Sequence, residues 1–233
     1  MTSPVAIKQY FIKRLGFSSF LRSDKANKLI LDKKYYIRKF KSQVEQEKVL
    51  FIHVPKAAGT SIVKSIYGTE DWTHLSLADY ETIHGSEISS YFKFAFVRNP
   101  YSRLYSAYHY LKDKSDVEFD KLWREKHLRS DFYTFIETWL TRKNIESCSI
   151  DHFRTQTSFL LNSQQKIDVN FIGKIENLTD DYQQLMKILA KDVPLSKENV
   201  HHNKEVFNPS SLPDNCRKII ESVYDVDFKN FNY

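Results

Sequence analysis

Val-Leu-Phe-Ile-His-Val-Pro-Lys-Ala-Ala-Gly-Thr-Ser-Ile, residues 49–62, is the stretch that decides the fold. Residues 49–54 form a short apolar run rich in β-branched and aromatic side chains, which predicts a strand covered on both faces. Pro55 ends the strand because proline has no N–H to donate. Lys56 and small residues then lead to the hydroxyls at 60–61, which suit a helix N-cap. A strand, loop and helix start of this kind predicts a site for phosphate or sulfate.

The usual nucleotide-binding loop has a different order of residues. Its pattern, G-x-x-x-x-G-K-[ST], places the lysine directly after the second glycine. Here Lys56 precedes Gly59, the only glycine of the stretch, by three residues. Taken alone, the stretch is also compatible with a strand, turn and helix that carry an incidental lysine.

A second strand and helix follow in residues 93–108, Lys-Phe-Ala-Phe-Val-Arg-Asn-Pro-Tyr-Ser-Arg-Leu-Tyr-Ser-Ala-Tyr. We expect a strand over residues 94–97 and a helix with Asn99 as its N-cap and proline at its first position. Arg98 falls at the carboxyl end of this strand. Ligands bind outside those ends in open α/β sheets, so Arg98 and Lys56 should face one crevice if the two strands are parallel neighbours.

The two motifs together resemble the cofactor signatures of the carbohydrate sulfotransferases that use 3′-phosphoadenosine 5′-phosphosulfate (PAPS). This family includes the Golgi enzymes that sulfate heparan and chondroitin chains and their bacterial relatives. The resemblance is strong over residues 49–108. It implies one α/β sulfotransferase domain over residues 49–233, with a central, mostly parallel sheet flanked by helices as in P-loop kinases. Residues 1–48 would form a basic helical extension before it.

The resemblance also assigns roles to individual residues. The first motif would hold the 5′-phosphosulfate, and the arginine and a serine of the second would hold the 3′-phosphate. The residues carried over by position are Lys56, Gly59, Thr60, Ser61, Arg98 and Ser106. Ala57 and Ala58 belong to the same predicted cofactor site, because small residues let the backbone approach a ligand closely.

A sugar hydroxyl attacks poorly unless a base accepts its proton, and histidine suits that task near neutral pH. His84 precedes Gly85 and is similar in place to the His-Gly element of the heparan-type relatives, although Ser86 replaces its second histidine. His84 is therefore the predicted general base. A helix-surface histidine beside a C-cap glycine is the alternative, with His53 or His152 as the next candidate base.

Two later segments are predicted to complete the site. Residues 151–161 mix apolar anchors with polar groups that suit sugar hydroxyls and carboxylates, and they resemble a segment on the family's acceptor side. The predicted acceptor contacts are His152, Arg154 and Gln156, with helix-surface residues as the alternative. Lys204 lies in the basic loop 200–208, which is predicted to cover the nucleotide, and it is a predicted cofactor-binding residue that contacts a phosphate. Two adjacent histidines in this loop lack further ligands at suitable spacing, so no metal is predicted.

Elements outside the motifs follow from periodicity and capping residues. Residues 72–77 are predicted as a short strand and residues 169–176 as a longer one. Asp131 is predicted to cap a helix whose apolar side chains follow helical spacing. A C-terminal helix is expected to pack Ile219, Ile220, Val223 and Tyr224.

Charge and composition indicate which classes of molecule this protein binds. The formal net charge is +6 and the pI about 9.1, which favours a negatively charged partner: the cofactor, an acidic or lipid-linked glycan, or a membrane surface. No RNA-binding or helix-turn-helix signature is present, so nucleic acid is not predicted. The basic amphipathic pattern of residues 5–15 favours a helix that docks on its own domain, with contact to an anionic membrane as the alternative.

Two cysteines cannot build a secreted disulfide framework, and no signal peptide or apolar run of about 20 residues is found. These features predict a cytoplasmic enzyme of the bacterial type. Two rival functions stay open. A nucleotide or small-molecule kinase would need a magnesium-binding carboxylate where the second strand ends in Arg98. A non-catalytic anion- or glycan-binding module is compatible with the composition.

Overall fold

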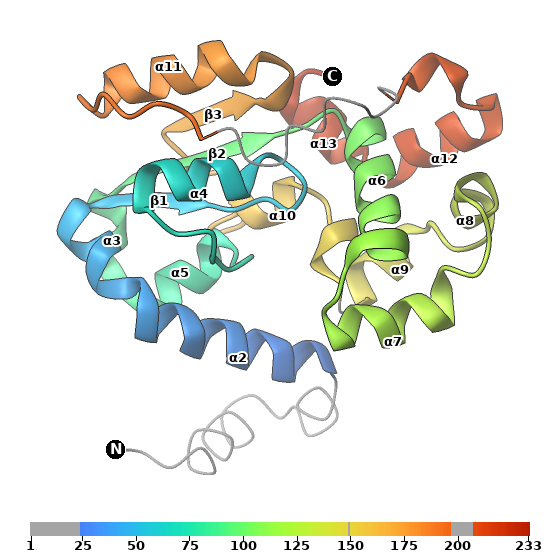
Figure 1. Cartoon of the computed structure of the whole chain (residues 1–233), viewed down its shortest axis with the longest axis horizontal. Helices are drawn as coiled ribbons and strands as arrows, with labels where there is room; N and C mark the ends of the chain where they lie inside the picture. The colour runs from blue at the N-terminus through green and yellow to red at the C-terminus, as the bar shows by residue number, and fades with distance from the viewer. Residues whose placement is uncertain (1–23, 149, 197–206) are drawn as a thin grey trace.

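Three parallel strands form the centre of the structure, in the order β1-β2-β3 (Figure 1). They are β1 (Val49–Ile52), β2 (Phe92–Val97) and β3 (Phe171–Lys174). Residue 49 pairs with residue 92 and residue 94 with residue 171, so all three carboxyl ends meet at one edge of the sheet. The prediction of an α/β domain with a parallel sheet flanked by helices is confirmed.

The computed structural model describes residues 24–148, 150–196 and 207–233. Its α-helices are α2 (Asp24–Lys39), α3 (Lys41–Glu47), α4 (Gly59–Tyr67), α5 (Leu77–His84), α6 (Pro100–His109), α7 (Glu118–His127), α8 (Phe132–Thr138), α9 (Arg142–Ser147), α10 (Thr157–Leu160), α11 (Leu178–Ile188), α12 (Asp214–Val223) and α13 (Asp225–Phe231). None of these helices has the length and apolar character that a membrane span needs. Lys204 and the basic pattern of residues 5–15 lie outside the described ranges.

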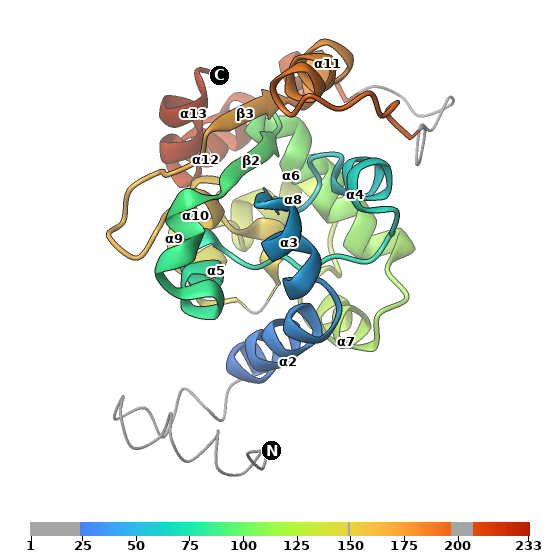
Figure 2. The ribbon, with the colours of Figure 1, turned by 90° about the vertical axis from the view of Figure 1, so that its left-hand side faces the viewer.

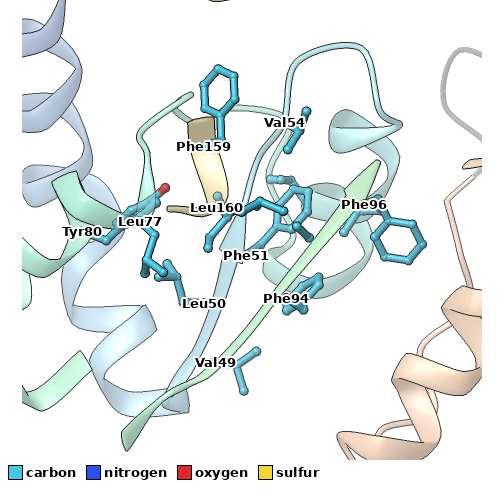
Figure 3. Packing of buried hydrophobic residues seen from close by; sticks show 14 of the residues in the cluster. Val49, Leu50, Phe51, Val54, Leu77, Tyr80, Phe94, Phe96, Phe159 and Leu160 are labelled. Carbon is cyan, nitrogen blue, oxygen red and sulfur yellow. The ribbon is translucent and has the colours of Figure 1, made fainter. Parts of the chain in front are cut away.

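The sheet is covered on both faces, as its apolar sequence predicts. Helix α4 lies on one face, and α5 and α10 lie on the other (Figure 2). Side chains of a strand alternate between faces, so Leu50 of β1 points toward Leu77 of α5, while Phe51 packs against Phe94 of β2 with ring centroids 5.0 Å apart (Figure 3). All four residues of β1 are buried, as is typical of a parallel strand covered on both faces.

Helices α2 and α3 pack on the same core. Tyr36, Phe40 and Val44 are buried within the cluster that surrounds the sheet. The predicted division of the chain at residue 48 stays a prediction.

A second apolar cluster lies among the helices at the side of the sheet, and α6 belongs to it. Leu104, Ala107 and Tyr108 of α6 are buried there. Asn99 caps this helix through its side chain, and Pro100 is its first residue, as predicted. Because one side of α6 is fixed in this cluster, its other side can present polar residues to the sheet edge.

Residues 72–77 do not form the predicted strand. Residues 72–76 run as a loop, and Ser76 caps α5, which starts at Leu77, through a capping box with Asp79. This capping box provides hydrogen-bond partners for N–H groups at the helix start. A helix therefore begins where the alternation of apolar and polar residues alone would predict a strand.

Candidate active site

A cleft of about 1850 Å³ lies at the carboxyl edge of the sheet. Both cofactor motifs contribute to its walls, together with α11 and the segment that follows α11. The predicted site residues that line it are Lys56, Ala58, Gly59, Thr60, Ser61, Arg98, Ser106 and His152. The prediction that Lys56 and Arg98 face one crevice is therefore confirmed. The side chain of Ala57 is instead fully buried in the core.

The loop before α4 has an unusual backbone. Lys56 and Ala58 have φ values of 68° and 59°, in the left-handed region that few residues other than glycine adopt. Such conformations cost free energy and gather at functional sites. Here they turn the chain sharply from β1 toward the start of α4.

The start of α4 differs from the prediction. The N-cap is Ala58, which has no side chain to accept from the first N–H groups, whereas Thr60 and Ser61 lie inside the first turn. Helix N-terminal amides without a side-chain cap bind anions well, since they point outward with the positive end of the helix dipole. The absence of a capping side chain therefore favours an anion at this end of the cleft.

Gly59 is needed because another side chain comes very close. A Cβ atom at this position would lie 1.7 Å from Nε2 of His53. The imidazole of His53 thus packs directly on the first turn of α4, which only glycine permits.

The second motif places Arg98 beside the cleft. Its Nε donates to Oγ of Ser102 at 3.0 Å, and that hydroxyl in turn donates to the carbonyl of Asn99 at 3.1 Å. Burial lowers the pKa of the Arg98 guanidinium, and the nearby charge of Glu176 acts in the opposite direction. Ser106 lines the cleft one turn after Ser102. Arginine and serine at this spacing can hold a phosphate.

Gln156 does not line the cleft, so it is not placed to contact an acceptor there as predicted. Its side chain is fully buried, with Oε1 accepting from the Arg98 amide at 2.9 Å and Nε2 donating to the Arg98 carbonyl at 2.7 Å. The buried carboxylate of Asp227, on α13, accepts from the backbone N–H of Gln156. Gln156 therefore fixes the backbone of Arg98, and sequence reasoning missed Asp227 because it lies 71 residues away.

Arg154 is also placed away from the cleft wall. Its guanidinium lies over the ring of Phe159, 4.5 Å from the centroid, and its Nη1 is 3.5 Å from Oδ1 of Asp151. Its carbonyl accepts from Arg103, whose Nε also donates to the carbonyl of Pro55 at 3.0 Å. The buried Arg103, which the sequence motifs did not single out, ties the first loop to α6.

His84 lies away from the cleft, which contradicts the prediction that it receives the proton. Its side chain is fully buried at the end of α5, with Nε2 2.8 Å from the hydroxyl of Tyr36 on α2. Its ring also packs against Tyr91. Gly85 is the C-cap of α5, so the short His-Gly match reflects a helix end.

Three other histidines meet in the cleft. The ring of His74 lies 4.3 Å from that of His53 and 5.7 Å from that of His152, measured between centroids. All three residues line the cleft near Lys56. His74 comes from the loop of residues 72–76, and no motif or periodicity in the sequence marks it.

His74 has the best-defined proton-accepting nitrogen. Its Nδ1 lies 3.2 Å from the carbonyl of His53, and because a carbonyl only accepts, Nδ1 carries the proton and Nε2 a lone pair. Burial lowers the pKa of His74 to about 4, and lowers those of His53 and His152 well below the usual value. The imidazole of His74 is thus neutral at pH 7, which leaves the Nε2 lone pair available to accept a proton, and burial makes it a weaker base than a solvent-exposed imidazole.

Comparison with known sequences identifies the family. The model of the sulfotransferase family matches residues 43–233, so the chain belongs to the sulfotransferase family. It is similar to the mouse protein carbohydrate sulfotransferase 12, with 24% identity over 176 residues. That match covers 63% of this chain and 41% of the relative, so the chain spans about two fifths of the relative's length. No solved structure matches.

Proposed function

We propose that this sulfotransferase moves a sulfuryl group from PAPS to a hydroxyl of a carbohydrate acceptor. The observation that carries the proposal is that two candidate anion sites and a neutral histidine line one cleft. The anion sites are the N-terminus of α4 with Lys56, and Arg98 with Ser106. A carbohydrate acceptor is also suggested by the name of the mouse relative.

The two anion sites suit a nucleotide with phosphate groups at both ends. The 5′-phosphosulfate would be held by Lys56 and by the first turn of α4, where the absence of a capping side chain leaves room for an anion. The 3′-phosphate would be held by Arg98 and Ser106. When bound, PAPS supplies the sulfuryl group and a phosphate that leaves with added negative charge.

The residues of the chain then have separate tasks. Lys56 and the α4 amides neutralise the charge that develops on the leaving oxygen, which favours the transition state over the ground state. Nε2 of His74 accepts the proton of the acceptor hydroxyl while its oxygen forms the new bond to sulfur. Because the walls of the cleft would hold the donor and the acceptor hydroxyl next to each other, positioning contributes to the rate as well.

The kinase alternative requires a carboxylate that can hold magnesium at the second strand. Glu176 is a carboxylate in the cleft wall beside Arg98. Its two oxygens accept from the amide of Asn99 at 2.7 Å and from the hydroxyl of Tyr233 at 2.8 Å. Glu176 is thus used to hold the start of α6, which weighs against a magnesium role.

The proposal is tested by incubating the protein with PAPS and a panel of neutral, acidic and lipid-linked glycans. Mass spectrometry should find a glycan that gains one sulfate together with release of adenosine 3′,5′-bisphosphate (PAP). ATP in place of PAPS tests the kinase alternative. Phosphate transfer from ATP, or PAP binding without any sulfate gain across the panel, would count against the proposal.

Arg98→Ala should weaken binding of PAP selectively. Loss of a charge-assisted hydrogen bond costs about 1.5–3 kcal/mol, which is roughly a 10- to 150-fold weaker affinity. Adenosine 5′-phosphate lacks the 3′-phosphate, so its affinity should change little. Isothermal calorimetry with both nucleotides measures the difference, and Arg129→Ala, an exposed arginine outside the cleft, is the matched control. Equal losses for both nucleotides would remove Arg98 from the 3′-phosphate site.

A further inference from the structure

Tyr110 stands where α6 changes its geometry. The α-helix ends at His109 and continues as a π-helical turn over Tyr110–Lys114, closed by the Ser115 amide on the carbonyl of Tyr110 at 2.9 Å. Single π-turns inside or after α-helices are rare overall, and those that do occur often lie at functional sites. Tyr110 lines the cleft, whereas Leu111, which follows it, is buried in the second apolar cluster.

The ring of Tyr110 contacts both halves of the proposed site. The Lys56 ammonium lies 3.8 Å from the ring centroid, within the range of a cation–π interaction. The ring of His152 is stacked on Tyr110 at 5.1 Å and 24°, and His152 in turn meets His74. Tyr110 therefore joins the lysine of the donor side to the histidines of the acceptor side.

We propose that Tyr110 is a positioning residue that holds the Lys56 side chain in its productive place. A lysine side chain is long and flexible, so ordering it before the reaction reduces the entropy lost in the transition state. The face of an aromatic ring attracts the ammonium but brings no negative charge of its own. This contact therefore orders Lys56 without neutralising it. The effect on turnover rests on the proposed sulfuryl transfer, whereas the contact itself does not.

Two variants separate the ring from the phenol hydroxyl. Tyr110→Phe keeps the ring face and should retain turnover within about twofold. Tyr110→Leu loses the ring and should lower kcat by about 3- to 30-fold, with PAP affinity changed much less. Tyr133→Leu, which makes the same change at an exposed tyrosine of α8 outside the cleft, is the control. Equal losses in the Phe and Leu variants would overturn the proposal, because the ring face would then not matter.

A double-mutant cycle tests whether Tyr110 acts through Lys56. In single-turnover measurements, Tyr110→Leu should have little further effect once Lys56 is replaced by methionine. If Tyr110→Leu lowers the single-turnover rate of the Lys56→Met enzyme by the same factor as that of the wild type, the proposal is overturned and Tyr110 acts on the histidine side.

A spectroscopic readout keeps the contact testable apart from the reaction. Lysines are reductively methylated with ¹³C, which preserves their charge, and the Lys56 signal is assigned by its absence from Lys56→Arg. An ammonium over a ring face should show an upfield ring-current shift that persists in Tyr110→Phe and disappears in Tyr110→Leu. If this shift is observed but no glycan gains sulfate, the proposed function is refuted, whereas the contact between Lys56 and Tyr110 is confirmed. A Lys56 signal unshifted in the wild type would refute the contact.

Discussion

Replacing Lys56 with methionine is expected to lower kcat by about 100- to 1000-fold at saturating PAPS, the range seen when one group that stabilises developing charge is removed. Methionine keeps an unbranched apolar side chain and removes only the charge and the N–H donors. PAP binding should weaken by less than about tenfold, because the amides at the start of α4 and the Arg98 site remain. Steady-state kinetics with the acceptor found in the glycan panel, and calorimetry with PAP, measure the two effects.

Lys143→Met is the matched control for this experiment. It removes the same charge from an exposed position on α9, outside the cleft, and should leave both quantities unchanged. A Lys56→Met enzyme with near-normal kcat and a PAP affinity reduced by the same factor as kcat/KM would make Lys56 a binding residue only. A loss of folded protein, monitored by circular dichroism, would instead indicate a structural role in the strained loop.

The two cofactor motifs could be predicted because their signals are local. An apolar run, a proline and small residues predict β1 and its loop, and Asn99 followed by proline predicts the start of α6. The meeting of Lys56 and Arg98 then needs only one further premise, that the two strands are parallel neighbours. That premise holds in the structure.

The remainder of the site depends on contacts between residues far apart in the chain. Gln156 and Arg154 have side chains that suit a sugar, and nothing in their neighbourhood reveals that one is fixed to Arg98 and the other lies on Phe159. A side-chain amide can equally well form hydrogen bonds with the N–H and C=O groups of a buried backbone. Residue type alone therefore cannot separate a ligand contact from a structural hydrogen bond.

The choice of histidine fails for a related reason. The His-Gly pair at 84 is a sequence feature, but glycine at a helix end is common for conformational reasons alone, and Gly85 has a φ of 68°. His74 carries no local signal. Its tautomer and low pKa arise from the carbonyl of His53 and from burial, both of which exist only in the folded chain.

His74→Asn is expected to lower kcat by about 100- to 10,000-fold, the contribution of a positioned general base. The asparagine side-chain amide can still donate to the carbonyl of His53, so the loop should keep its place while the proton-accepting Nε2 is lost. PAP affinity should stay within about threefold. His84→Ala, by contrast, removes a buried partner of Tyr36 and should lower the free energy of unfolding by about 1–3 kcal/mol without a comparable loss of kcat.

The pH dependence of His74 adds a second test. Since burial lowers its pKa to about 4, kcat/KM for PAPS should show no acidic limb near pH 6.5 that belongs to this group. Below pH 6.5 the unfolded chain binds a proton at this histidine while the folded chain does not, so stability falls as the pH drops toward 4. His74→Asn should reduce that slope by at most about 1.4 kcal/mol per pH unit. If His74→Asn retains its turnover and its pH slope of stability is unchanged, the base must be sought at His53 or His152.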